Sequence, residues 1–199
     1  MRKLLLASTN QGKLRELQAL LAGEGWQVLS LADYPDFIAP PETGESFAEN
    51  ALLKAHAAAA YTGLITLADD SGLTVDCLGG APGIYSARYA GESCTPAECN
   101  EKLLRQLAGT PMPLRTAAFV CVLAIVIPDG AQQIFCGRLE GLIAEDYAGE
   151  GGFGYDPLFY LPPYKQTVAQ LSAEQKNEIS HRARALRDAK EYMRSINQI

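Results

Sequence analysis

Leu64-Ile65-Thr66-Leu67-Ala68-Asp69-Asp70-Ser71-Gly72 is the stretch that decides the fold. Its first five residues predict a buried strand, which delivers two adjacent acids to a Ser-Gly turn. Two carboxylates at the end of a buried strand repel each other and lose solvation, so a chain that keeps them there usually holds a cation between them. Oxygen ligands without a nearby histidine cluster favour Mg²⁺. An ordinary solvated turn would have the same residues, and this segment alone does not separate the two interpretations.

Hydrophobic periodicity and turn residues predict further elements on both sides of this strand. Pro128-Asp129-Gly130 separates two apolar runs and predicts a hairpin. We therefore expect an α/β fold in a single domain, residues 1–199, with an elongated mixed β-sheet flanked by helices and two lobes around a central cleft. The expected strands are 3–8, 26–31, 64–68, 115–127 and 133–139, and the expected helices are 12–22, 46–61, 95–107 and 172–197.

Composition and charge restrict the classes of function. The chain has 199 residues, and 48% of them are hydrophobic, which is enough for a substantial core. With 17 basic and 23 acidic residues the net charge is −6, which argues against a nucleic acid polymer as partner. The five cysteines form no CxxC pair, so a reducing compartment fits better than a disulfide framework or a zinc site. No segment resembles a complete signal peptide or a transmembrane helix, so we expect a soluble, cytoplasmic protein with no membrane partner.

Ser8, Thr9, Asn10 and Lys13 form the first cluster that could carry chemistry, between the first expected strand and helix. A helix N-terminus offers free N–H groups, and these side chains add donors and one positive charge, which suits a phosphate. The Walker A pattern is absent. A capped helix with an exposed lysine explains the same residues.

Two loops form the second and third clusters. Glu42 precedes the expected 46–61 helix; such a carboxylate is usually only solvated, but it would become a metal ligand if it reached Asp70. Gly151-Gly152-Phe153-Gly154-Tyr155-Asp156-Pro157 does not match the Rossmann fingerprint. Its glycines could let a flat ring approach and stack on an aromatic side chain, whereas Tyr155 is expected in the core.

Lys176, Ser180, His181 and Arg182 form the fourth cluster, in the last expected helix. Such residues are normally solvated or act as caps. Alternatively, they donate hydrogen bonds to a base carbonyl or to a phosphate.

In this order and spacing, the clusters resemble the inosine/xanthosine triphosphate pyrophosphatase family. The matching segments extend over nearly the whole chain, and the chain departs from the pattern at Ser8-Thr9, where many members carry Thr-Gly. The segments are Ser8-Thr9-Asn10-x-x-Lys13, Glu42-Thr43-Gly44, 47–54, 68–73, 79–89, 151–157 and 179–182.

The resemblance implies an ITPase-like fold, Mg²⁺ as cofactor and a homodimer. It implies hydrolysis of a small-molecule purine nucleoside triphosphate (ITP, dITP or XTP) to the monophosphate and pyrophosphate. Glu42 and Asp70 would share the metal, Asp70 would also act on the attacking water, and Asp69 would support it. The implied substrate-binding residues are Ser8, Thr9, Asn10 and Lys13 toward the triphosphate, Phe153, Tyr155, Asp156, Lys176, His181 and Arg182 toward the base, and Ser71 and Gly154 at a part of the substrate that is not specified.

Base choice in this family would follow from hydrogen-bond donors. Hypoxanthine and xanthine present an acceptor oxygen at position 6, where adenine presents an amino donor. A pocket with donors from Lys176, His181 and Arg182 favours the oxygen, and polar sites of this kind discriminate by up to about 10⁴-fold. Guanine shares the oxygen, so its 2-amino group must be rejected by shape or by backbone acceptors near Tyr155 and Asp156.

Two rival functions remain open. One is a pyrophosphatase for dTTP, UTP or modified pyrimidines, against which the 176–182 cluster argues. The other is a nucleotide sensor without catalysis, against which Asp69 and Asp70 argue, because extra negative charge weakens triphosphate binding unless a metal intervenes. An aspartyl-phosphate phosphatase fits less well, since the expected D-x-D spacing is missing.

Overall fold

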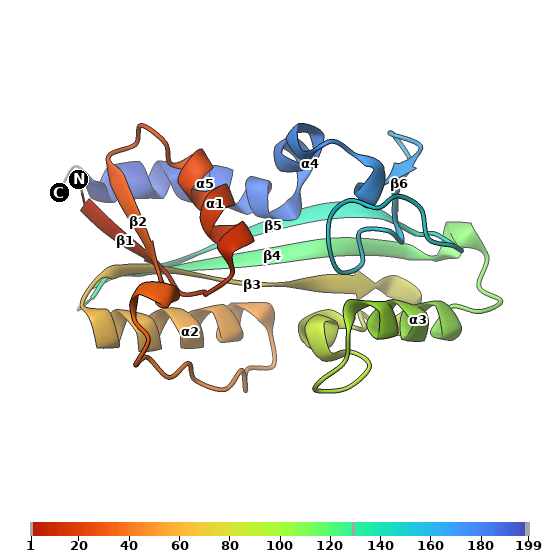
Figure 1. The fold of residues 1–199 in the computed structure, drawn as a ribbon, viewed down its shortest axis with the longest axis horizontal. Coiled ribbons are helices and arrows are strands. Elements are labelled where there is room, and N and C mark those ends of the chain that lie inside the picture. The colour runs from red at the N-terminus through yellow and green to blue at the C-terminus, as the bar shows by residue number, and fades with distance from the viewer. Residues whose placement is uncertain (1, 129, 198–199) are drawn as a thin grey trace. The chain divides into compact units, whose positions relative to one another are not determined.

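The computed structural model describes residues 2–128 and 130–197. Within these residues a seven-stranded sheet has the order β2-β1-β3-β4-β5-β6-β7. Strand β1 pairs in parallel with β2 and β3, whereas β6 pairs antiparallel with β5 and β7, which confirms the α/β class and the mixed sheet (Figure 1). The strands are β1 (Arg2–Leu6), β2 (Trp26–Ser30), β3 (Ile65–Val75), β4 (Thr116–Val126), β5 (Gln132–Ile143), β6 (Phe159–Leu161) and β7 (Gln166–Thr167).

Side-chain caps mark the starts of α2 and α3. The Thr95 side chain and the Glu98 carboxylate form a reciprocal capping box before α3. Before α2 the Ser46 side chain accepts from the Glu49 N–H, but the Glu49 carboxylate accepts from the backbone of Glu45. The α-helices are α1 (Gln11–Leu20), α2 (Phe47–Thr62), α3 (Pro96–Gln106), α4 (Ala173–Ile179) and α5 (His181–Asn197). In the described part of the chain, none of them combines the length and apolar character that a membrane span requires.

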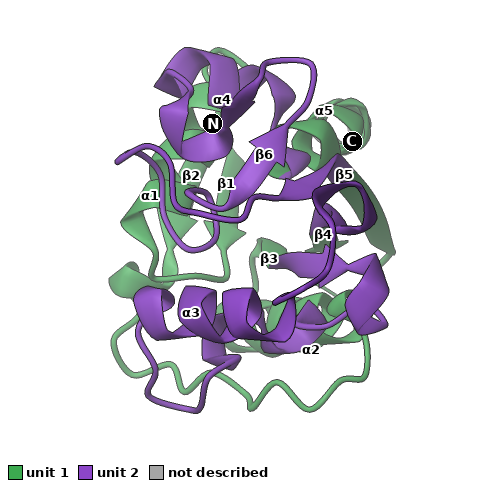
Figure 2. Cartoon of the chain, turned by 90° about the vertical axis from the view of Figure 1, so that its right-hand side faces the viewer, with its two compact units in different colours: residues 1–70, 121–137, 182–199 green, residues 71–120, 138–181 purple. Residues whose placement is uncertain are grey.

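The chain divides into two compact units, coloured separately in Figure 2. Unit 1 comprises residues 1–70, 121–137 and 182–199, and unit 2 comprises residues 71–120 and 138–181. Strands β3, β4 and β5 contribute residues to both, so each unit is discontinuous in sequence. The interpretation of residues 1–199 as a single domain stays a prediction.

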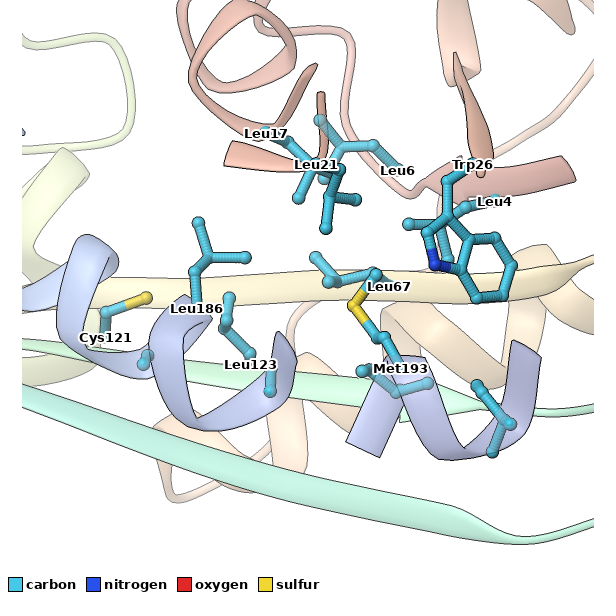
Figure 3. Close-up of a cluster of buried hydrophobic side chains, with 14 residues drawn as sticks. Leu4, Leu6, Leu17, Leu21, Trp26, Leu67, Cys121, Leu123, Leu186 and Met193 are labelled. Carbon is cyan, nitrogen blue, oxygen red and sulfur yellow. The ribbon is translucent and has the colours of Figure 1, made fainter. Parts of the chain in front are cut away.

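One face of the strands of unit 1 packs against α1 and α5 (Figure 3). Leu4 and Leu6 are two residues apart on β1 and therefore share this face. Leu186 and Met193 are two turns apart on α5 and meet the same cluster, so they lie on the buried side of α5.

Helix α2 covers the other face of these strands (Figures 1 and 2). Its buried side is lined mainly by alanines: Ala51, Ala55, Ala58 and Ala59. Small side chains let the helix axis approach the sheet, so longer polar side chains on α2 can reach β3.

Unit 2 has its own core. Phe119 of β4 stacks on Phe159 of β6 with ring centroids 4.3 Å apart. Leu73 of β3 and Leu103 of α3 are fully buried in the same cluster. Each unit therefore has a hydrophobic core of its own.

The structure corrects two predicted boundaries. Strand β3 does not end at Ala68 but runs through both aspartates to Val75. Each acid has its own cation, Asp69 on one face of the sheet and Asp70 on the other, so neither needs a turn. The predicted 172–197 helix is interrupted at Ser180, whose ψ of 152° is extended. The break separates Ile179, which packs in the core of unit 2, from Leu186, which packs in unit 1.

The predicted hairpin connects β4 and β5. The Ile127 N–H donates to the Ala131 carbonyl at 3.0 Å, which closes the turn. Asp129, the middle residue of the turn signal, lies outside the described residues. Strand β5 extends to Ile143, four residues beyond the predicted end at Leu139.

Candidate active site

Strand β3 presents its two acids to opposite faces of the sheet, because successive side chains of a strand alternate. Asp69 faces α1 and α5, where its carboxylate lies 2.8 Å from Lys13 Nζ and 3.5 Å from Arg182 Nη2. Asp70 faces α2, where its Oδ1 lies 2.9 Å from Lys54 Nζ. The expectation that one cation lies between the adjacent acids is therefore wrong, since each acid has its own.

The Asp69 side of unit 1 holds a buried network of full charges. Burial alone would raise the pKa of Asp69, but the positive charges of Lys13 and Arg182 outweigh it and hold that pKa well below the usual range. Arg182 is also buried, and burial alone would lower its pKa. The negative charges of Asp69 and Glu16 outweigh burial and raise the pKa of Arg182 above its usual value. Glu16 Oε2 accepts a hydrogen bond from Arg182 Nη1 at 2.9 Å. The predicted role of Arg182 toward a base stays a prediction, and its guanidinium has protein partners in this structure.

On the Asp70 side, one ammonium bridges two carboxylates. Lys54 Nζ lies 2.8 Å from Glu42 Oε1 as well as 2.9 Å from Asp70 Oδ1. Burial raises the pKa of Asp70 in spite of Lys54, and the charge of Glu42 adds to the rise. Burial alone would lower the pKa of Lys54, but the two carboxylates reverse this and raise it. The predicted convergence of Glu42 and Asp70 is thus seen around Lys54.

The second oxygen of Asp70 is unsatisfied. Oδ2 is buried and has no hydrogen-bond partner among the described residues. A buried carboxylate oxygen of this kind is costly unless a donor, a water or a cation completes it. With Glu42 on the same ammonium, it offers the hard oxygen donors that Mg²⁺ prefers. The described residues contain no group of three His, Cys, Asp or Glu able to hold a metal, so water and substrate oxygens would have to complete the shell.

Asn50 lies on α2 and interacts with Asp70 of β3, although the sequence analysis did not identify it. Its Oδ1 accepts from the Gly44 N–H at 2.8 Å, in the loop that carries Glu42. Its amide opposes part of the rise in the pKa of Asp70, yet among the described residues its Nδ2 completes no hydrogen bond.

The predicted phosphate loop follows β1 and caps α1. The Asn10 Oδ1 accepts from the backbone N–H groups of Gly12 and Lys13 at 2.8 and 3.2 Å. These two N–H groups are therefore not free for a phosphate, and the helix is capped, as in the alternative interpretation. The Ser8 hydroxyl accepts from the Asn10 N–H, whereas Thr9 is exposed. These hydrogen bonds connect the loop to the first turn of α1.

In unit 2, Phe153, Asp156 and Lys176 form one cluster. Asp156 Oδ2 accepts from the Phe153 N–H at 2.8 Å and forms an ion pair with Lys176. Lys176 Nζ lies 4.4 Å from the centroid of the Phe153 ring, in a cation–π contact. The ring is 61% exposed, so it could stack with a planar ligand.

The glycines around Phe153 are explained by the protein itself. A Cβ on Gly152, whose φ is +75°, would lie 2.1 Å from Asp156 Oδ2, and one on Gly151 would lie 2.8 Å from the Ala169 carbonyl oxygen. Close protein packing therefore requires glycine at these two positions. A Cβ on Gly154 would meet no atom within 4 Å.

His181 and Tyr155 are both buried in unit 2. The His181 ring stacks on Phe119 with centroids 5.1 Å apart. Beside it is a cavity of about 10 Å³, lined in part by Asp156, Lys176 and His181, which has room for about one water. The Tyr155 hydroxyl donates to the Ser86 carbonyl at 2.8 Å, and burial raises its pKa, so the prediction that Tyr155 packs in the core is confirmed.

Sequence reasoning missed several residues of these clusters and underrated Lys54. The sequence did contain a signal for Lys54: a lysine four residues after Asn50, on the alanine-lined side of α2, indicates that its charge has a buried partner. Glu16 and Asn100 carried no signal beyond an ordinary helical position. Asn100 is buried on α3 and its Nδ2 donates to the Gly154 carbonyl at 2.9 Å. Ser71, predicted to touch substrate, follows Asp70 in β3 and is half-buried.

Comparisons with known proteins agree with the predicted resemblance. The model of the Ham1 family matches residues 4–192. A curated dITP/XTP pyrophosphatase of Desulforamulus reducens is 53% identical over 194 residues, which cover 98% of this chain and 96% of the relative. One of Geobacter sulfurreducens is 50% identical over 193 residues, 97% of each chain.

Solved structures give the same result. A HAM1 protein from Coxiella burnetii has a TM-score of 0.92 and 42% identity, covering 97% of this chain and 98% of its own. The Staphylococcus aureus Ham1 protein has a TM-score of 0.90 and 44% identity, covering 98% and 99%. Family model, relatives and structures span nearly the whole sequence, and the chain therefore belongs to the Ham1 family.

Proposed function

We propose that this protein hydrolyses the non-standard purine nucleoside triphosphates dITP, XTP and ITP to the monophosphate and pyrophosphate. It would remove deaminated purines from the nucleotide pool. The printed function of the curated relatives supports the reaction. The observation in this chain that carries it is the buried, unpartnered Oδ2 of Asp70 beside Glu42 and Lys54.

Asp70 is the catalytic carboxylate of the proposal. Its free oxygen can accept a hydrogen bond from a water, orient that water toward the phosphate chain and take its proton. Burial raises the pKa of Asp70, which makes the carboxylate a better base than one in open water. Glu42 binds the same Lys54 ammonium.

Glu42 and Asp70 would hold Mg²⁺, which when bound neutralises phosphate charge and orients the phosphate oxygens. Lys54 keeps the two carboxylates together and neutralises part of their charge. Ser8, Thr9, Asn10, Lys13 and Ser71 are the proposed phosphate contacts. Phosphoryl transfer asks the protein mainly for positioning and charge, which these groups supply.

Unit 2 carries most of the proposed base-reading groups. The Phe153 ring stacks on the base, and the Lys176 ammonium, held by Asp156, donates to the oxygen at position 6. Adenine would leave this donor facing an amino group. His181 and Arg182 are further proposed donors, and Gly154 and Tyr155 contribute through the backbone of the loop.

Three parts of the proposal rest on the family resemblance. These are Mg²⁺ as the metal, a homodimer as the assembly, and a cytoplasmic location, where nucleoside triphosphates are used. Light scattering of the purified protein tests the dimer: twice the chain mass of 21.4 kDa supports it, and a single chain mass contradicts it.

Product analysis tests the function. The protein is mixed with Mg²⁺ and, separately, with dITP, XTP, ITP, dATP, dGTP and dTTP, and the products are separated by ion exchange. We expect pyrophosphate and monophosphate from the first three and little turnover of the others. Orthophosphate as product would contradict the bond assignment, and a preference for dTTP would support the pyrimidine alternative. Binding without turnover would support a sensor.

A further inference from the structure

Asn50 is a fully buried amide on the alanine-lined side of α2. A buried carboxamide has donors and acceptors at opposite ends, and each unsatisfied group costs stability. Alanine at this position would continue the apolar lining and suit the helix better. Asn50 is therefore best explained by what its two ends contact.

The oxygen end holds the loop that carries Glu42. The Gly44 N–H donates to Asn50 Oδ1 at 2.8 Å. The loop fits closely here, since a Cβ on Gly44 would lie 2.8 Å from Asn50 Oδ1 and 2.7 Å from Glu49 Cβ. Movement of Asn50 would therefore displace the segment two residues after Glu42.

The nitrogen end faces the Asp70 carboxylate. Asn50 interacts with Asp70, and Asn50 Nδ2 and Asp70 Oδ2 are both buried without a completed hydrogen bond among the described residues. Asn50 and Lys54 are four residues apart on α2 and so share a face of the helix. The two oxygens of Asp70 thus differ: Lys54 binds Oδ1 at 2.9 Å, whereas Oδ2 completes no hydrogen bond among the described residues.

We propose that Asn50 is a positioning residue that couples the Glu42 loop to the Asp70 carboxylate, fixing the loop with its amide oxygen and supporting the carboxylate with its amide N–H. The proposal rests on the proposed function of the Glu42–Lys54–Asp70 cluster. It makes one uncharged side chain responsible for the relative arrangement of two carboxylates from separate segments.

Two substitutions separate the two ends of the amide. Asn50→Ala removes both contacts. Asn50→Asp keeps an oxygen acceptor for the Gly44 N–H but removes the amide donor toward Asp70. Ala58→Gly is the control, because it loosens the same helix with Asn50 intact.

The measurements are kcat and KM for dITP, melting temperature, and Mg²⁺ affinity by calorimetry without nucleotide. We expect kcat to fall about 10- to 100-fold in both Asn50 variants with KM nearly unchanged, and Mg²⁺ affinity to fall about 10-fold or more in Asn50→Ala, as for groups that orient metal ligands. Ala58→Gly should lower the melting temperature and leave kcat within about twofold.

Wild-type kcat in Asn50→Asp would overturn the proposal, and so would variants that lose activity only in proportion to their unfolded fraction. If Asn50→Ala does not fold, Asn50→Asp carries the test. Wild-type protein without pyrophosphate release would overturn the proposed function instead, and the Mg²⁺ calorimetry would still decide the role of Asn50.

Discussion

The Lys54–Asp70 ion pair of unit 1 and the Lys176–Asp156 ion pair of unit 2 join the same two residue types in different surroundings. In unit 1, Lys54 is shared with a second carboxylate, and one oxygen of Asp70 is left without a hydrogen-bond partner among the described residues. In unit 2, one oxygen of Asp156 binds both Lys176 and the backbone of Phe153, and the ammonium lies over an aromatic ring. The same pair of residue types thus leaves an acceptor open in unit 1 and shapes an aromatic loop in unit 2. We assign the first to the phosphates and the second to the base.

The largest expected effect comes from Asp70→Asn. The amide keeps the shape of the carboxylate but cannot take a proton from water, so kcat for dITP should fall about 10³-fold or more. Pyrophosphate release under saturating substrate measures it, and a melting temperature near that of wild type shows that the fold is intact. A variant with near-normal kcat would remove Asp70 from the mechanism.

Lys54→Met should have the next largest effect. It leaves Glu42 and Asp70 facing each other without their common cation, and breaking a mostly buried ion pair costs about 3 kcal/mol. Added Mg²⁺ should restore much of this stability, because a divalent cation can replace the ammonium between the carboxylates. Thermal melts with and without Mg²⁺ measure it. A stabilisation by Mg²⁺ no larger than that of wild type would contradict the prediction that the metal replaces the ammonium between the two carboxylates.

Phe153→Ala should affect binding rather than chemistry. Base stacking on an aromatic side chain contributes about 1–3 kcal/mol, so KM for dITP should rise about 10-fold while kcat changes little. Steady-state kinetics with dITP measures both constants. Leu114→Ala, which removes a similarly exposed apolar side chain of unit 2 outside the cluster, is the matched control. A fall in kcat at constant KM would contradict the stacking role.

The smallest effect concerns acid stability. The pKa of Asp69 is held below its unfolded value of about 3.9 by Lys13 and Arg182, against the effect of burial. Its contribution to stability is therefore present above that unfolded value and is lost as the pH falls toward the folded pKa. The melting temperature of Asp69→Asn should lie about 5 °C or more below that of wild type near neutral pH, and the gap should narrow near pH 3.

A surface carboxylate provides the control for this pH series. The pKa of Glu24 is lowered to about 2 by hydrogen bonds to Arg194 and Lys190; its side chain is half-buried and its partner Arg194 is exposed. The effect of Glu24→Gln should vanish at about 1 M salt, whereas that of Asp69→Asn should persist, because buried charges are screened less. A gap between wild type and Asp69→Asn that is independent of pH would show that Asp69 is not ionised in the folded protein.

The sequence predicted the elements and clusters better than the contacts within them. Hydrophobic periodicity and turn residues placed β1, β2 and α3 within a few residues, since those signals are local. The end of β3 was predicted wrongly, because two adjacent acids followed by Ser-Gly are typical of a turn. The cations that let both acids stay within the strand come from α1, α2 and α5, which are distant in sequence. The break at Ser180 was missed because it depends on which core Ile179 joins. Asn50 could not be found from sequence reasoning, since its role depends on a loop and a strand that pack on one helix face.

The division of labour between the two ion pairs is tested most directly by comparing the two lysines. The measurement is kcat/KM for dITP and for dATP in wild type, Lys54→Met and Lys176→Met. We predict that Lys54→Met lowers both values by the same factor and preserves the dITP/dATP ratio, whereas Lys176→Met reduces that ratio about 10-fold or more. An unchanged ratio in Lys176→Met, or a ratio that falls in Lys54→Met, would contradict the assignment of the Lys54–Asp70 pair to the phosphates and of the Lys176–Asp156 pair to the base.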